Sequence, residues 1–341
     1  MKNLSLALPF LFLANFGLAE TTLLVNVNGY TLTNDREIKR FTALKFTDDL
    51  IDRLYLLEEE LPTGIETIID GKGQTLIPGL IDAHGHMESY GSSLLRVDLV
   101  GANSEQEAVA RILAFSQKNR GLEWIQGRGW NQVLWDVREF PASASLDALI
   151  SDRPVWVTRI DGHAGWANSL AMELAGINLA TENPTGGQIM RDQDGNATGV
   201  LIDTAMNYVS SQIPRPTLEE QKITLETAMK TLAGYGITSV HDAGVGSQTI
   251  RAYKELVEAA PLIIRVNAML SASDPLYQDR LSEGFYRSKD DTFVMHSVKV
   301  VSDGALGSRG AAMIESYSDD QGNRGLLRYD DERLEFQFQL N

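Results

Sequence analysis

The arrangement of apolar and polar positions changes near Pro78 and divides the chain into two parts. Before this point, the stretches TLLVNVNGYTL and TIIDGKGQTLI are rich in β-forming residues and contain Asn-Gly, Asp-Gly and Lys-Gly pairs. Such stretches predict short strands joined by tight turns, here at Asn28-Gly29 and at residues 70–73. We therefore expect residues 20–77 to form a small β unit.

After this point, short apolar runs alternate with amphipathic stretches that have helical spacing. The apolar runs predict strands at residues 76–84, 153–161, 236–244, 262–270 and 296–304. The clearest helices are predicted at residues 104–119 and 217–235, the second opened by Thr217 as a cap with Glu220 three residues later. Continuous apolar strands between helices predict an α/β fold with a buried parallel sheet. The segment from residue 87 to 216 is too long for one crossover and predicts an inserted lobe.

The N-terminus has the pattern of a secretory signal peptide. Lys2 precedes an apolar stretch over residues 4–16, and small residues follow up to Ala19. This pattern predicts a signal peptide at residues 1–19, cleaved after Ala19. A membrane-spanning helix would instead need about 20 apolar residues. We expect an exported protein, periplasmic or secreted, without stable membrane insertion after cleavage.

The composition of the whole chain narrows the classes of partner. Asp and Glu number 46 against 30 Lys and Arg, which gives a formal net charge of −16. A chain this acidic is repelled by phosphate backbones and anionic membranes, so we do not expect nucleic acid as a partner. The sequence contains no cysteine, which excludes disulfides and thiol chemistry.

The apolar run TLIPGLIDAHGHM ends in two histidines separated by one glycine. Alternate side chains of a strand point the same way, so Asp82, His84 and His86 are predicted to share one face. Gly85 removes a side chain from the opposite face and lets the backbone bend at the strand end. Two imidazoles at the C-terminal end of a parallel strand suit Zn²⁺ or a similar divalent ion. Taken alone, a His-x-His pair is also typical of structural or solvent-exposed histidines.

In its context, LIPGLIDAHGHM resembles the strand-one metal motif of the amidohydrolase superfamily, metal-dependent hydrolases built on a (β/α)₈ TIM barrel. Further motifs resemble the N-substituted formamide deformylase-like branch, also labelled YtcJ-like, and lie at residues 128–135, 153–177, 186–203, 236–244 and 298–313. The resemblance implies that residues 78–341 form about the first half of the barrel, with the inserted lobe within it. It also implies that residues 20–77 are part of a small β-sandwich.

Lys299 lies among valines in a predicted buried strand, SVKVVSDG. An unpaired ammonium group there would be costly, so the lysine needs a carboxylate partner, a lowered pKa or chemical modification. The resemblance implies modification, because amidohydrolases with two metal ions often carboxylate a strand-four lysine into a bridging ligand. Lys299, Val301 and Asp303 are predicted to share a face, which makes Asp303 a candidate substrate-binding residue.

Other candidates come from the lobe and from strand two. Residues Asp161, His163, Trp166 and Asn168 match a motif that lines the substrate side in this branch. His163 is equally well explained by local hydrogen bonds in a turn. Alternation prevents His241 and Asp242 from both facing the site, so His241 is predicted, with Asp82, to support the metal ligands from behind.

The resemblance also implies groups that the sequence lacks. In the family, strands five and six each bring a metal-binding histidine, and strand eight brings an aspartate as general base. We therefore expect the N-terminal part of a longer hydrolase, one that cleaves carbon–nitrogen bonds other than peptide bonds in small amides or formamides. One or two divalent ions, such as Zn²⁺, would activate water, and this chain alone would be inactive or nearly so. The alternatives are a non-catalytic binding relic and half of a two-chain assembly, and a homo-oligomer is compatible with these readings.

Overall fold

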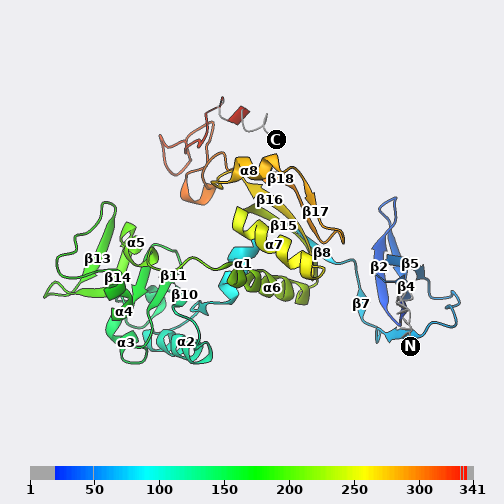
Figure 1. Cartoon of the computed structure of the whole chain (residues 1–341), viewed down its shortest axis with the longest axis horizontal. Coiled ribbons are helices and arrows are strands. Elements are labelled where there is room, and N and C mark those ends of the chain that lie inside the picture. Colours follow the sequence, from blue (N-terminus) through cyan, green and yellow to red (C-terminus); the bar gives the residue numbers. More distant parts are fainter. Residues whose placement is uncertain (1–19, 49, 331, 333, 336–341) are drawn as a thin grey trace, which may run out of the picture. The chain divides into compact units, whose positions relative to one another are not determined.

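A computed structural model describes residues 20–48, 50–330, 332, 334 and 335. The predicted signal peptide at residues 1–19 lies outside the described residues. The chain forms two compact units that divide between Gly79 and Leu80, close to the predicted boundary after residue 77. Figure 1 shows the elements of both units.

Among the described residues, no helix has the length and apolar character that crossing a membrane requires.

The first unit consists of β-strands in two small sheets. The four-stranded sheet has the order β5-β4-β1-β6 and contains β1 (Thr21–Val25), β4 (Ala43–Thr47), β5 (Leu50–Tyr55) and β6 (Thr67–Asp70). The three-stranded sheet has the order β3-β2-β7 and contains β2 (Asn28–Leu32), β3 (Ile38–Phe41) and β7 (Thr75–Leu76). Leu23, Ala43 and Tyr55 form a buried cluster in this unit.

The turn predicted at Asn28-Gly29 is wrong. Both residues belong to β2, and the chain changes direction before them, where Asn26 has a φ of 54°. Gly29 is needed for packing, because a Cβ there would lie 2.3 Å from the ring of Phe41 on the paired strand β3. The second predicted turn is confirmed: a backbone hydrogen bond closes residues 71–74.

The main sheet of the second unit has the order β17-β18-β16-β15-β8. Its strands are β8 (Leu80–Gly85), β15 (Ile237–Val245), β16 (Arg265–Ser271), β17 (Tyr286–Arg287) and β18 (Phe293–Lys299). Four of them, β8, β15, β16 and β18, are parallel neighbours in chain order, which confirms the predicted α/β fold. A (β/α)₈ barrel requires this order of its first four strands, and closure into a barrel stays a prediction.

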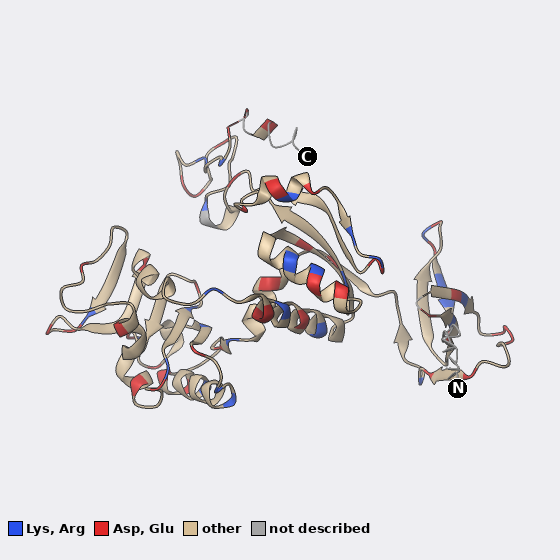
Figure 2. Cartoon of the chain, in the orientation of Figure 1, with Lys and Arg blue, Asp and Glu red and all other residues tan. Residues whose placement is uncertain are grey.

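Helices cover one face of this sheet (Figure 1). They are α1 (Met87–Leu94), α6 (Leu218–Gly234), α7 (Ser247–Ala259) and α8 (Tyr277–Ser282). Leu225, Met229 and Tyr253 from the helices pack with Val240 and Phe293 from the strands in one buried core. Figure 2 shows charged residues along the outer sides of α6 and α7, as expected for helices with one buried face.

The predicted inserted lobe forms a second sheet with the order β13-β14-β12-β11-β10-β9. Its strands are β9 (Val97–Asp98), β10 (Ile125–Trp130), β11 (Val155–Arg159), β12 (Ala164–Ala167), β13 (Gly187–Arg191) and β14 (Ala197–Asp203). Its helices are α2 (Glu105–Lys118), η1 (Gln132–Leu134), α3 (Ser143–Asp147), α4 (Ser169–Leu174), η2 (Thr204–Met206) and α5 (Asn207–Ser210). Trp130, Trp135 and Trp166 are buried in the core of the lobe.

Outside the lobe, a further 3₁₀ turn, η3 (Leu306–Ser308), follows β18 of the main sheet.

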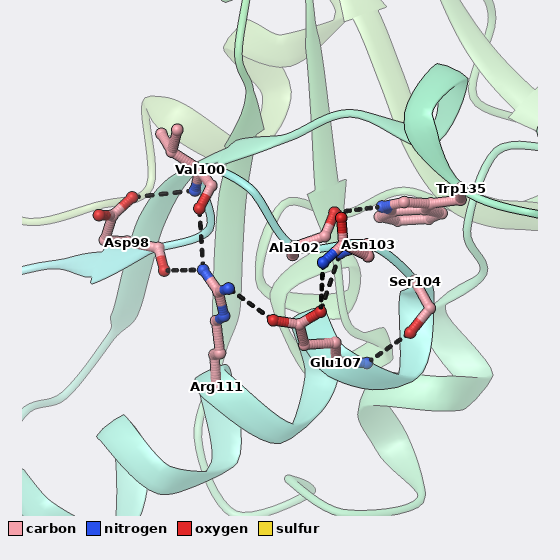
Figure 3. A network of polar contacts seen from close by, with 8 residues as sticks. All are labelled: Asp98, Val100, Ala102, Asn103, Ser104, Glu107, Arg111 and Trp135. Carbon is pink, nitrogen blue, oxygen red and sulfur yellow. Dashed lines mark hydrogen bonds and ion pairs between the residues drawn. The ribbon is translucent and has the colours of Figure 1, made fainter.

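Polar contacts fix the start of α2 in the lobe (Figure 3). The hydroxyl group of Ser104 caps the helix by accepting a hydrogen bond from the backbone N–H of Glu107. The carboxylate of Glu107 pairs with Arg111 one turn later. The indole N–H of Trp135 donates to the backbone carbonyl of Ala102, 3.0 Å away. These contacts hold the loop between β9 and α2 against the core of the lobe.

The predicted cap of α6 is confirmed. The helix begins at Leu218, and the Thr217 hydroxyl accepts a hydrogen bond from the backbone N–H of Glu220. The Glu220 carboxylate in turn accepts one from the backbone N–H of Thr217, which completes a capping box. Because α6 packs on α1 and α7, this cap stabilises the helix layer behind the main sheet.

We expect Thr217→Ala to lower the free energy of unfolding by about 1 kcal/mol, because it leaves helix N–H groups without a partner. Urea unfolding followed by circular dichroism measures this change. Thr227→Ala is the matched control, since its half-buried hydroxyl group donates to the Ile223 carbonyl within the same helix and caps no helix end. That variant should keep or slightly raise stability. Equal losses in the two variants would contradict the capping role.

Candidate functional site

His84 and His86 lie together at the C-terminal end of β8, and both are exposed. Their ring centres are 5.3 Å apart, and the ring planes are at 80° to each other. Two imidazoles on one tetrahedral zinc ion have ring centres about 5 Å apart, given the usual Zn–N distance. The pair therefore fits a shared divalent ion in donor type and in spacing.

A backbone carbonyl determines which nitrogen of His86 is free. The Nδ1 atom of His86 lies 3.0 Å from the carbonyl oxygen of Ala243, at the end of the neighbouring strand β15. Because a carbonyl can only accept, this contact requires the hydrogen on Nδ1. The neutral ring then has its lone pair on Nε2, the state that a metal ligand needs.

The prediction that Asp82 shares a face with both histidines is wrong. Asp82 pairs with Val240, but Gly85 pairs with Asp242, so one extra residue of β8 interrupts the alternation. A Cβ on Gly85 would lie 2.9 Å from the Val240 side chain and 3.4 Å from the Asp82 carboxylate. Asp82 therefore lies on the Val240 side of the strand. Its carboxylate still accepts a hydrogen bond from the backbone N–H of His84, at 3.0 Å.

Asp242, which was not predicted as a site residue, makes the strongest link to the histidine segment. It is 3% exposed, and its carboxylate accepts hydrogen bonds from the backbone N–H of Met87 at 3.0 Å and the hydroxyl group of Tyr253 at 2.9 Å. Burial raises the pKa of Asp242, and burial beside this carboxylate raises the pKa of Tyr253 well above its usual value. His241 is half-buried, and alternation places it on the opposite face of β15 from Asp242. The residue behind the histidine segment is therefore Asp242, and the prediction that His241 supports the ligands from behind is wrong. A carboxylate in an apolar strand was the available signal for Asp242.

A second polar chain reaches the segment after His86. The carboxylate of Glu88 accepts a hydrogen bond of 2.6 Å from the Thr249 hydroxyl group, which itself accepts one of 2.5 Å from the Gln221 amide. Glu88, His86 and Asp242 line a small pocket of about 70 Å³. These hydrogen bonds thus connect α1, which follows His86, to α7 and α6.

Lys299 is the last residue of β18 and is half-buried. A Cβ on Gly244 would lie 3.6 Å from Cγ of Lys299, so the lysine side chain runs along the end of β15. Gly244 follows Ala243, which binds His86, and the three predicted ligands therefore gather at one sheet edge. Within the described residues, no carboxylate forms an ion pair with Lys299.

The predicted shared face of Lys299, Val301 and Asp303 is wrong, because β18 ends at Lys299. Asp303 instead lies in irregular chain that bridges to Leu327. Its carboxylate accepts a hydrogen bond of 3.0 Å from the backbone N–H of Ala312. Asp303 therefore stabilises the segment after the strand, away from the strand face.

Asp161 and His163 lie in the turn between β11 and β12 of the lobe. The Nδ1 atom of His163 is 2.7 Å from the carboxylate of Asp203, and the ring is exposed. Asp161 pairs with Arg159 and accepts a hydrogen bond from the backbone N–H of His163. The contact with Asp161 is the local hydrogen bonding of a turn, whereas the His163 ring itself contacts Asp203 at the end of β14 and stays open to solvent.

Trp166 and Asn168 are fully buried in the lobe. The indole N–H of Trp166 donates to the backbone carbonyl of Ala142 at 3.0 Å. The Asn168 side-chain oxygen accepts from the backbone N–H groups of Val155 and Ala171, and its amide donates to two backbone carbonyls. These contacts account for both side chains without a ligand, and their role in substrate binding stays a prediction.

No group of three or more His, Cys, Asp or Glu side chains in the described part of the chain is arranged to hold a metal ion. The donor set at the sheet edge is therefore His84 and His86, with Lys299 as a third member if it carries an added carboxylate.

Comparison with known proteins gives the family. The sequence model of the Amidohydrolase family matches residues 67–340. The chain is 33% identical over 275 residues to Protein LONG AFTER FAR-RED 3 of Arabidopsis thaliana. This aligned region covers 77% of this chain and 47% of that protein. It is 28% identical over 195 residues to the N-substituted formamide deformylase of Arthrobacter pascens. This aligned region covers 55% of this chain and 36% of that protein. The chain thus spans about half the length of these relatives or less.

Solved structures agree with the family match. The crystal structure of an uncharacterized metal-dependent hydrolase from Pyrococcus furiosus superposes with a TM-score of 0.72 at 27% sequence identity. The similarity covers 94% of this chain and 64% of that one. The strand-end histidine motif, the order of the parallel strands and these matches lead to one conclusion. The chain belongs to the amidohydrolase family.

Proposed function

We propose that this chain provides the first metal-binding segment of a metal-dependent amidohydrolase that hydrolyses carbon–nitrogen bonds other than peptide bonds. The observation that carries this proposal is the pair His84 and His86 at the end of the first of four parallel strands, with Nδ1 of His86 held by a backbone carbonyl. The relative named N-substituted formamide deformylase supports small N-substituted amides or formamides as the substrate class.

In this proposal His84, His86 and Lys299 hold a divalent ion, for which Zn²⁺ is the best match to the donors. The ion would lower the pKa of a bound water and polarise the substrate carbonyl. The chain's own residues prepare the site: Ala243 leaves Nε2 of His86 free, and Asp82 fixes the backbone at His84. The exposure of both imidazoles gives ion and substrate access.

We propose that Lys299 is carboxylated. The unprotonated amine would add to carbon dioxide and release a proton, forming a carbamate whose oxygens can bind a metal ion. Support comes from its half-buried position along Gly244 and from the lack of a carboxylate partner within the described residues. An anionic oxygen group suits this position better than an unpaired ammonium group beside a divalent cation.

Hydrolysis also needs a group that delivers a proton to the leaving amine. The carboxylates beside the histidines, those of Asp82, Glu88 and Asp242, already accept hydrogen bonds from the protein. Because the described residues at the sheet edge supply only His84, His86 and Lys299 as candidate ligands, we expect little or no turnover by this chain alone. From the sequence of residues 1–19 we further propose that the protein is exported and meets its substrate outside the cytoplasm.

We expect the purified chain to bind Zn²⁺ and His86→Ala to weaken binding at least about tenfold, because one of few ligands is lost. Isothermal titration calorimetry measures the affinity, with His296→Ala as a control that removes an exposed histidine from β18. An equal loss in the control, or no zinc binding by the unchanged chain, would contradict the proposal. A chelator should abolish whatever release of formate from N-substituted formamides is detected.

The His163–Asp203 contact gives the lobe a pH-dependent feature. The hydrogen bond and charge of Asp203 raise the pKa of His163 above its usual value. The folded state thus favours the imidazolium, and the stabilisation is fully present below the unfolded-state pKa and lost as pH rises through the raised value. We expect Asp203→Asn to lower the pKa of His163 measured by NMR. Asp194→Asn, in the turn between β13 and β14, should leave it unchanged.

A further inference from the structure

Two consecutive residues of β15 bind two consecutive residues of the metal-binding segment. The carboxylate of Asp242 accepts the backbone N–H of Met87, and the carbonyl of Ala243 accepts from Nδ1 of His86, each at 3.0 Å. The Asp242 contact lies on the helix-covered side of the sheet, where the carboxylate is 3% exposed. A contact inside the core therefore determines where the His86 ring meets β15.

The core holds Asp242 from its other side through Tyr253. This tyrosine belongs to α7, is fully buried, and donates its hydroxyl group to the second carboxylate oxygen of Asp242 at 2.9 Å. Its ring stacks on Phe293 of β18, with ring centres 4.9 Å apart. A buried carboxylate is costly without donors, so the two hydrogen bonds fix its place and direction. The Tyr253–Asp242 pair thus connects α7 and β18 to the segment that carries His86.

We propose that Asp242 and Tyr253 are positioning residues that keep the imidazole of His86 in the tautomer and orientation needed for metal binding. The metal-binding part of this inference rests on the proposed function. Asp242 holds the backbone at Met87, and this keeps Nδ1 of His86 within reach of the Ala243 carbonyl. Without that bond, the ring is free to rotate and to place its hydrogen on either nitrogen.

The first measurement needs no metal. In the full chain, the ¹⁵N shifts of the His86 ring at a pH where it is neutral should show a single tautomer with the hydrogen on Nδ1. We expect Asp242→Ala to give averaged shifts of two tautomers, and Tyr253→Phe to give a smaller change in the same direction. Asp242→Asn should preserve the single tautomer, because its side-chain oxygen can still accept from Met87 and its amide can donate to Tyr253.

The second measurement is Zn²⁺ affinity by calorimetry, where Asp242→Ala should weaken binding about tenfold and Asp242→Asn should restore it. Ser116→Ala is the stability control, because it removes a buried hydroxyl group of the lobe that binds Arg153. It should lower the melting temperature without changing the His86 shifts or the affinity.

An unchanged His86 tautomer in folded Asp242→Ala and Tyr253→Phe would overturn the inference. If Asp242→Ala does not fold, as judged by circular dichroism, Tyr253→Phe decides, since it removes one hydroxyl group and keeps the ring that packs on Phe293. A third outcome is that the variants lose the single His86 tautomer but the unchanged chain binds no zinc. This result would support the positioning role and contradict the proposed function. The two hypotheses therefore fail separately.

Discussion

The pairing of β8 with β15 is the constraint on which the candidate site depends. The strands are parallel, but β8 contains one extra residue between Asp82 and Gly85 relative to β15. That extra residue ends the alternation and sends the chain from the sheet into α1, which starts directly after His86. Irregularities of this kind recur beside active sites because they re-aim a side chain. Here the result is two adjacent imidazoles at an accessible sheet edge.

The glycine between the histidines is explained by the same pairing. A Cβ at Gly85 would lie 2.9 Å from the Val240 side chain, which is fully buried in the core behind the sheet. Contacts that short do not occur without displacement of one partner, and Val240 is surrounded by packed residues. Gly85 is thus required for the strands to approach, in addition to any freedom it gives the backbone.

Much of the fold follows from local pattern. The helix at residues 217–235, its cap and the parallel strands could be predicted because each depends on neighbouring residues and period. Three predictions failed at positions where the pairing or the length of a strand depends on distant segments. Asn28-Gly29 lies in a strand because Gly29 faces Phe41, Asp82 lies on the other face because of the extra residue in β8, and Asp303 lies beyond the end of β18. None of these pairings leaves a local signature.

The site shows why a resemblance yields ligands more readily than their supports. The proposed ligands lie at the exposed ends of the strands, and a motif such as His-Gly-His is visible in the sequence. The proposed supporting residues lie on the covered face, where a carboxylate such as Asp242 looks like an isolated polar residue in an apolar run. Its partners, a backbone N–H and a tyrosine on α7, are fixed only by folding. In the positioning role that we propose, the core behind the sheet acts on the His86 imidazole through the backbone that the two faces share.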